Sequence, residues 1–349
     1  MADDPVVSVV MGVFNEAPHL ANTLDSLLAQ DYPHWEAVVV DDGSQDGSRE
    51  ILAHYQQQDE RIQPLFLEHN GGLTRALNRG LGIARGRYIA RLDGDDLCLP
   101  HRLKRQVALL EDRPDINLVG GAWLEVREGK ERLVQPPTEP ILLRWHALFA
   151  NPFCHGSMLF RRLWQGEPLF YEPAFAVAQD YELWCRLMEK GGVAALSAPP
   201  LVRRCQRSTG ISVRHKEEQY RLALTVVRAN LQRIIPFHAF TMEETARLRT
   251  LATYPGRLLP EEVVDYAILL RLFRQFVLNY PPADRMLLGK VLAASLLTVM
   301  GRDNWSVVWK TGLWWQMVTT LPLPLLFSLP RRFLPQRTPS WGAGTRNMA

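Results

Sequence analysis

The chain has 349 residues, of which 22% are charged and 47% hydrophobic, a balance that suits one large or two ordinary globular domains and argues against disorder. Its net charge of +3 is too small to indicate nucleic acid as a partner. Its cysteines form no CxxC pair, which favours reduced thiols over a disulfide framework or a zinc site. The opening stretch MADDPVVSVV lacks the features of a signal peptide, so we expect a cytoplasmic protein and leave attachment to the inner face of the membrane open.

The first 120 residues alternate predicted strands and helices. Apolar runs predict strands, and helically spaced apolar residues predict helices. This alternation predicts an α/β fold with a Rossmann-like, mostly parallel sheet that has helices on both faces. The predicted strands cover residues 6–13, 35–42, 62–68 and 87–93, and the predicted helices cover 18–30, 47–58 and 73–84.

The pattern changes after residue 120. Residues 117–134 predict two strands around a turn at Gly129, residues 156–162 a short strand, and residues 178–190 an amphipathic helix. From residue 216 to the end the chain reads as almost wholly helical. We therefore expect a catalytic domain over 1–215, with its nucleotide-binding part at about 6–120 and its acceptor part at about 121–215, followed by a helical region over 216–349.

Aspartates cluster where two predicted strands end. Ligands of parallel sheets bind at the carboxyl ends of the strands, so these side chains should meet at one sheet edge. The alternative for the first cluster is a turn in which Asp and Ser bond to their own backbone. The residues are Asp41, Asp42, Asp93, Asp95 and Asp96.

The DGDD stretch places Asp93 and Asp95 two residues apart, with Gly94 between them. Both carboxylates can reach one Mg²⁺ or Mn²⁺ ion, which prefers oxygen ligands and is commonly shared with substrate phosphates. A solvated loop or a calcium loop is the alternative, although the full calcium-loop pattern is missing. Taken alone, a D-x-D spacing is a weak signal.

The ordered set SVVMGVFNE, VVVDDGSQDGS, NGGLTRALNRGLGIARGRYIARLDGDD and LPHRLKRQ resembles family 2 glycosyltransferases of the GT-A fold. The similarity runs over residues 6–120 and continues more weakly to about 215. It implies an inverting enzyme that uses a nucleotide-diphosphate sugar, a divalent cation (Mg²⁺ or Mn²⁺), and a glycan or lipid-linked acceptor in cell-envelope synthesis.

The resemblance also implies roles for individual residues. It assigns the metal to Asp93 and Asp95, and the catalytic base to Asp180 in QDYELWCR. Such a base deprotonates the acceptor hydroxyl opposite the departing phosphate. Without the family, the pattern favours reading Asp180 as an N-cap or first-turn acid of a helix, a role that can coexist with catalysis. The nucleotide site is assigned to Val13, Phe14, Asn15, Glu16 and Asp42, and Asn78, on the helix before the D-x-D strand, is a further candidate for it.

Further polar residues keep two interpretations. Arg75, Asn78 and Arg79 form either a solvated helix face or contacts to the nucleotide, and His155 is either a core residue or a contact to donor sugar or acceptor. The stretch RRCQRSTGISVRH resembles the family's loop over the diphosphate and offers candidate contacts at Arg204, Gln206, Arg207 and Ser212.

The C-terminal segment 305–337 combines tryptophans, an uncharged run and flanking basic residues. A helical cap packed on the catalytic domain, peripheral attachment to membrane and a spanning segment are all compatible with it. Two alternatives to transferase activity are a non-catalytic nucleotide-sugar or glycan-binding relative and a sugar-phosphate nucleotidyltransferase. The retained acids argue against the first, and the missing Gly-rich, basic loop after the first strand argues against the second.

Overall fold

The computed structural model describes residues 6–205, 215–253 and 263–290. The chain divides into two compact units, of which the first comprises residues 1–143 and 151–223 and the second residues 144–150 and 224–349. We describe each unit by itself. The expected split of the catalytic region into nucleotide-binding and acceptor parts stays a prediction.

The first unit is built on a seven-stranded sheet of order β12-β6-β9-β4-β1-β2-β3. Neighbouring strands run parallel except at β9, which is antiparallel to both β4 and β6. The central strands are apolar on both faces because helices cover both, as expected for a parallel sheet. The strands are β1 (Val7–Val13), β2 (Trp35–Asp41), β3 (Ile62–Phe66), β4 (Tyr88–Arg91), β6 (Ile116–Gly121), β9 (Leu159–Arg161) and β12 (Gly192–Leu196).

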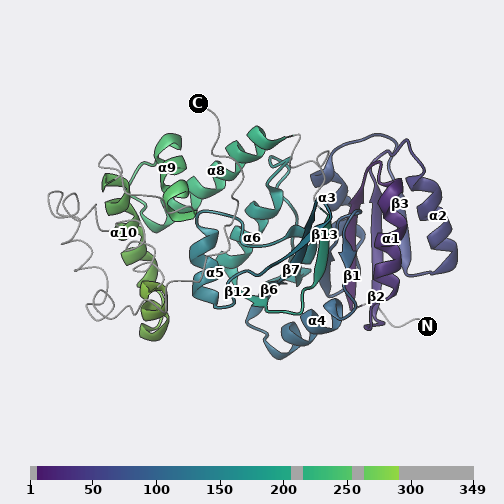
Figure 1. Cartoon of the computed structure of the whole chain (residues 1–349), viewed down its shortest axis with the longest axis horizontal. Helices are drawn as coiled ribbons and strands as arrows, with labels where there is room; N and C mark the ends of the chain where they lie inside the picture. The colour runs from purple at the N-terminus through teal and green to yellow at the C-terminus, as the bar shows by residue number, and fades with distance from the viewer. Residues whose placement is uncertain (1–5, 206–214, 254–262, 291–349) are drawn as a thin grey trace. The chain divides into compact units, whose positions relative to one another are not determined.

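Helices of the first unit flank this sheet (Figure 1). Helix α3 packs against β1 and β2, α1 packs beside α2, and both α4 and α6 contact β6. Their apolar faces supply the core, for example through Leu20, Leu24 and Leu27 of α1. The helices are α1 (Ala17–Leu28), α2 (Ser48–Gln58), α3 (Leu73–Ile83), α4 (Arg102–Asp112), the 3₁₀ turn η1 (His155–Ser157) and α6 (Gln179–Lys190). Helix α5 (Pro140–Ala147) begins in the first unit, and its residues from 144 onward belong to the second.

Two smaller sheets complete the first unit. One has the order β5-β13-β7-β8 and the other pairs β10 with β11. Their strands are β5 (Leu97–Cys98), β7 (Trp123–Arg127), β8 (Lys130–Val134), β10 (Leu163–Trp164), β11 (Glu167–Pro168) and β13 (Val202–Cys205).

The expected α/β architecture with a mostly parallel sheet is confirmed, but the prediction of two strands in residues 117–134 is wrong. The stretch forms three strands, because the chain leaves the large sheet after Gly121 and enters the small sheet at Trp123. Ala122, between them, exchanges backbone hydrogen bonds with Leu196 and Leu201. The expected turn at Gly129 is present, with positive φ at Glu128 and Gly129.

Most of the described residues of the second unit are helical. The expected helical region over 216–349 stays a prediction. The second unit contains α8 (Lys216–Ile234) from residue 224 onward, α9 (Met242–Thr253), α10 (Val263–Val277) and a helical stretch over 282–290. The Trp145 ring makes edge contacts with Phe149, Phe273 and Phe276. Among the described helices, none is both long and apolar enough to cross a bilayer. The segment 305–337 lies outside the described residues.

Candidate active site

The turns after β1 and β2 are held together at the carboxyl edge of the large sheet. Val13 lies opposite Asp41 in the register, and the Asp42 N–H donates to the Val13 carbonyl at 2.8 Å. The Asn15 N–H donates to Ser44 Oγ at 2.9 Å, and Asn15 Oδ1 accepts from the Gln45 N–H at 2.8 Å. The first turn is thus fixed on the second.

Some residues of the predicted nucleotide site stabilise these turns through hydrogen bonds. Asn15 takes a left-handed φ of 55°, which asparagine tolerates better than most residues. The Glu16 N–H donates to Ser48 Oγ at 2.9 Å. Phe14, in contrast, is 42% exposed at this edge, so its ring is accessible to a planar ligand. Nucleotide contacts of Val13 to Glu16 stay predictions.

The Asp42 carboxylate closes the loop in front of α3. It accepts from the Gly71 N–H at 2.9 Å and from the Gly72 N–H at 2.7 Å. Gly72 precedes α3 with a φ of 88°, a conformation that is strained for residues with a Cβ. Burial raises the pKa of Asp42, while the two glycine amides act in the opposite direction.

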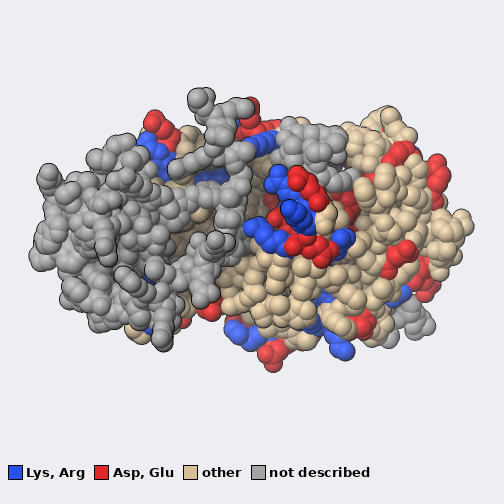
Figure 2. Space-filling model, in the orientation of Figure 1, with Lys and Arg blue, Asp and Glu red and all other residues tan. Residues whose placement is uncertain are grey.

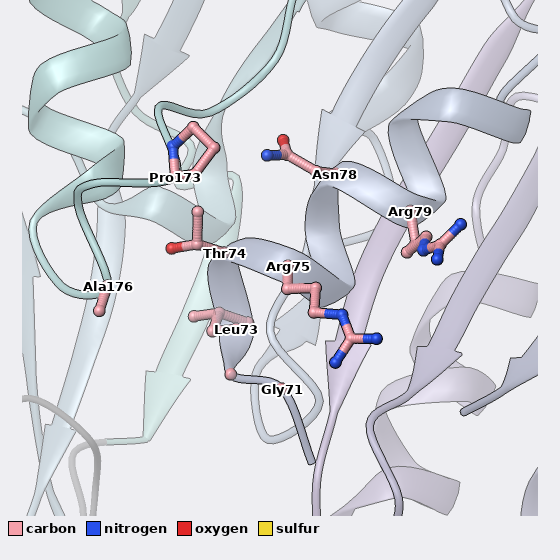
Figure 3. Close-up of a pocket in the computed structure, with 9 residues that line it drawn as sticks. Gly71, Leu73, Thr74, Arg75, Asn78, Arg79, Pro173 and Ala176 are labelled. Carbon is pink, nitrogen blue, oxygen red and sulfur yellow. The ribbon is translucent and has the colours of Figure 1, made fainter. Parts of the chain in front are cut away.

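A pocket of about 390 Å³ opens beside this loop (Figure 3). Arg75 and Arg79 extend from one side of α3, whereas Asn78 points toward Pro173. A cationic wall beside a helix N-terminus is suited to an anionic ligand. The lining residues are Gly71, Gly72, Leu73, Thr74, Arg75, Asn78, Arg79, Pro173 and Ala176.

The DGDD turn follows β4 at the same sheet edge. Asp93 pairs with the buried Arg91 through Oδ1, and its side chain is 30% exposed. Burial by itself would raise the pKa of Asp93, but the charge of Arg91 lowers it below the usual range. Asp93 is therefore held ionised. Asp95 is half-buried in the same turn.

Asp96 is the third carboxylate of this turn and is buried. Its Oδ1 accepts from the Cys205 N–H at 3.1 Å, and its Oδ2 has no hydrogen-bond partner in the described structure. Burial and the charges of Asp93 and Asp95 raise the pKa of Asp96 well above the usual range. A Cβ at Gly156 would lie 2.9 Å from Asp96 Oδ2 and 3.5 Å from Asp93 Oδ2, so glycine lets η1 approach both carboxylates.

The residues of this turn fit a divalent cation that substrate phosphates would help to hold. Within the described parts of the chain, no cluster of three or more His, Cys, Asp or Glu side chains is arranged for a metal. Mg²⁺, however, is commonly bound by only one or two carboxylates together with phosphate oxygens. Asp93 and Asp95 supply two carboxylates, and Asp96 Oδ2 is an unpartnered buried oxygen beside Asp93 Oδ2.

Asp180 lies in the first turn of α6 and is half-buried. Its Oδ2 accepts from Asn151 Nδ2 at 2.8 Å, and its Oδ1 accepts from the Tyr181 N–H at 2.8 Å. Burial raises the pKa of Asp180, and the negative charge of Asp93 adds to this effect. The structure therefore brings Asp180 within electrostatic reach of the D-x-D turn.

His155 and Asn78 are joined through Tyr171. His155 Nε2 lies 2.9 Å from the Tyr171 hydroxyl, and burial lowers the pKa of His155 to about 3, which leaves the imidazole neutral. The Asn78 amide both donates to the Tyr171 carbonyl and accepts from the Tyr171 N–H, each at 2.9 Å. Asn78 thus clamps a backbone segment, a function that the sequence did not indicate. Its contact with a nucleotide stays a prediction.

Arg204, at the end of β13, lies near the same carboxylates, since its charge lowers the pKa values of Asp96 and Asp180. Figure 2 shows basic and acidic side chains gathered over the region where Figure 1 labels β7 and β13. Ion pairs of this small sheet include Arg203 with Glu131 and Arg132 with Glu125. The other predicted loop contacts, Gln206, Arg207 and Ser212, lie outside the described residues.

The profile of "Glycosyl transferase family 2" matches residues 8–164. AmsE of Erwinia amylovora, an amylovoran biosynthesis glycosyltransferase, is 35% identical over 190 residues, which cover 53% of this chain and 70% of AmsE. The chain belongs to glycosyl transferase family 2. ExoO of Rhizobium meliloti (strain 1021), a succinoglycan biosynthesis protein, is 31% identical over 204 residues, which cover 55% of this chain and 58% of ExoO.

Residues 1–349 of S. aureus TarS in complex with UDP superpose with a TM-score of 0.54 at 17% identity, over 88% of this chain and 91% of that one. This similarity confirms the GT-A fold of the family member. The resemblance found in the sequence is confirmed, and the chain is a glycosyltransferase.

Sequence reasoning did not single out Asn151, which bonds to Asp180, or Gly156, which packs against the D-x-D turn. Neither residue belongs to a sequence motif whose spacing predicts this contact. Asp96 carried a signal, because it directly follows the D-x-D pair, but the sequence could not show that one of its oxygens is buried without a partner.

Proposed function

We propose that this family 2 glycosyltransferase transfers a sugar from a nucleotide-diphosphate sugar, with inversion, to a hydroxyl group of a glycan or lipid-linked acceptor in cell-envelope synthesis. The observation that carries the proposal is the juxtaposition of Asp180 and the D-x-D turn: Asn151 bonds to Asp180, and Gly156 of the same segment packs against Asp93 and Asp96. The negative charge of Asp93 also raises the pKa of Asp180. Relatives named for amylovoran and succinoglycan biosynthesis support the acceptor class.

In this reaction Asp180 is the general base. Its carboxylate takes the proton of the acceptor hydroxyl while that oxygen bonds to the anomeric carbon. The bond between the anomeric carbon and the diphosphate oxygen breaks on the opposite face, which inverts the configuration. A raised pKa suits this task, because a base with a pKa nearer neutrality accepts a proton more effectively.

We assign the diphosphate to the region between the D-x-D turn and the N-terminus of α3. Asp93 and Asp95 would hold a divalent cation, which, when bound, neutralises charge on the leaving diphosphate. The exposed Arg75 and Arg79 offer additional positive charge beside the pocket at Gly72. The exposed ring of Phe14 would stack on the base.

Release of nucleoside diphosphate from UDP-glucose, UDP-N-acetylglucosamine and GDP-mannose tests the proposal. Each donor is assayed with and without Mn²⁺, with water or a membrane lipid extract as acceptor. We expect release from at least one donor, and a fall of roughly 10²–10⁴-fold in Asp180→Asn, the usual range for loss of a general base. Donor affinity measured by calorimetry should be retained in this variant, because Asp180 acts on the acceptor.

Two results would contradict the proposal. A folded wild-type chain that binds donors but releases no diphosphate under any condition would indicate a non-catalytic relative. A parallel loss of donor affinity and turnover in Asp180→Asn would make Asp180 a donor ligand instead of the base.

We further propose that the segment 305–337 contacts the membrane at its cytoplasmic face, on the basis of its tryptophans and flanking basic residues. The full chain should then sediment with anionic liposomes and partly resist high salt. A chain ending near residue 302 should stay in solution. A full-length chain that ignores liposomes at low salt would contradict membrane contact.

A further inference from the structure

Asn151 is the residue at which the chain returns to the first unit, four residues before η1 begins. Both the NH₂ group and the oxygen of its side-chain amide form hydrogen bonds. Its Nδ2 donates to Asp180 Oδ2 at 2.8 Å, and its Oδ1 accepts from the Phe153 N–H at 3.1 Å. The second bond fixes the orientation of the amide. With the carbonyl oxygen held by the backbone, only the NH₂ group can face Asp180.

The segment that carries Asn151 is anchored independently of Asp180. Four residues later, His155 meets the Tyr171 hydroxyl, and Gly156 packs against Asp93 and Asp96. The Met158 carbonyl accepts from the Arg91 N–H at 2.9 Å and from Arg102 Nη2 at 3.1 Å. Asn151 is thus presented to α6 from a segment that is fixed on the D-x-D strand.

From this geometry we infer that Asn151 is a positioning residue that fixes the orientation of the Asp180 carboxylate toward the acceptor hydroxyl. Asn151 occupies Oδ2 from one side, and the Tyr181 N–H occupies Oδ1. Each oxygen keeps lone pairs for the acceptor proton. The inference rests on the proposed function of Asp180 as the base.

The amide also favours the ionised form of the base. A donor to a carboxylate stabilises its charge, so Asn151 works against the raised pKa that burial imposes on Asp180. Other titratable or charged groups whose charges act on Asp180, or on which its charge acts, include Asp93, Tyr171 and Arg204. None of these is altered by a substitution at residue 151.

Asn151→Asp is the sharpest test, because it keeps the shape of the side chain and the acceptor for the Phe153 N–H. It replaces only the donor that faces Asp180, and it places a like charge there. Release of nucleoside diphosphate from the donor that the wild-type chain uses fastest should fall roughly tenfold or more, within the range of interactions measured between contacting residues. Donor affinity by calorimetry should not change.

Two further readouts separate positioning from a general structural effect. The acid limb of the rate–pH profile should move to higher pH in Asn151→Asp, since a like charge raises the pKa of the base. In the Asp180→Asn background, Asn151→Asp should cause no further loss, because its target is already gone. Asn22→Asp, on an exposed position of α1, is the matched control for the added charge and should resemble the wild type.

The outcomes distinguish this inference from the proposed function. Normal turnover in Asp180→Asn would remove the base assignment and the inference with it. If Asp180→Asn loses turnover while Asn151→Asp keeps normal turnover and an unchanged rate–pH profile, the inference about Asn151 is overturned and the proposed function stands. Losses that multiply in the double variant would do the same, because Asn151 would then act independently of Asp180.

Discussion

The Asp42 carboxylate accepts a hydrogen bond of 2.7 Å from the N–H of Gly72, thirty positions later in the chain. This contact joins the end of β2 to the start of α3, and it requires the left-handed backbone of Gly72. The loop beside the predicted nucleotide site is therefore held by a carboxylate that the sequence had assigned to the nucleotide itself.

Replacing Gly72 by alanine should destabilise this loop. At a φ of 88° and a ψ of 157°, a region that is almost confined to glycine, an added Cβ costs about 1–3 kcal/mol, and relaxation of the backbone would withdraw the N–H from Asp42. The urea midpoint should fall and donor affinity should weaken. Gly82→Ala is the control, because residue 82 is helical, exposed and free of close neighbours, so alanine there should be neutral or stabilise by about 0.5–1 kcal/mol.

Asp95→Asn should lower turnover strongly and leave the fold intact. The substitution removes one of two predicted carboxylate ligands, whereas Asp93→Asn would also leave the buried Arg91 without its partner charge. Mn²⁺ binding followed by calorimetry in the presence of UDP should weaken in parallel. Asp115→Asn makes the same charge change at an exposed ion pair and should behave as wild type. Wild-type turnover in folded Asp95→Asn would refute the metal assignment.

The rate of transfer should fall at acid pH around a value above the ordinary pKa of aspartate. The base must be ionised to accept a proton, and burial raises the pKa of Asp180. The acid limb of the rate–pH profile should therefore report this raised value. An acid limb at the usual aspartate pKa, near 3.9, would mean that another group controls the reaction.

The free energy of unfolding should also depend on pH through Asp180. Because the folded-state pKa is raised, the contribution of this group is fully present below the unfolded pKa and is lost as the pH rises through the folded pKa. The unfolding free energy of Asp180→Asn, relative to wild type, should thus improve from pH 4 to pH 8. Asp59→Asn should show the opposite trend at lower pH: the hydrogen bond from Arg61 lowers the pKa of Asp59, so the stability that Asp59 contributes is lost as the pH falls below about 4 through the folded pKa. Equal trends in both variants would contradict the burial argument.

The sequence by itself determined the α/β class, the mostly parallel sheet and the location of the acids at its carboxyl edge. These follow from local signals, namely apolar runs of strand length, helical spacing, and polar residues directly after each strand. The sequence predicted that Asp42 and Asp93 follow the ends of two strands, and they follow β2 and β4, because the end of a strand is determined by local sequence.

Only the tertiary structure decided which groups meet. Asn151 and Asp180 are 29 residues apart, and their bond depends on how the segment before η1 and the first turn of α6 are brought together. The chain also changes sheets at Ala122, because strand pairing with β12 ends and pairing with β13 begins there. Such contacts depend on the register of distant segments, which neither periodicity nor spacing encodes.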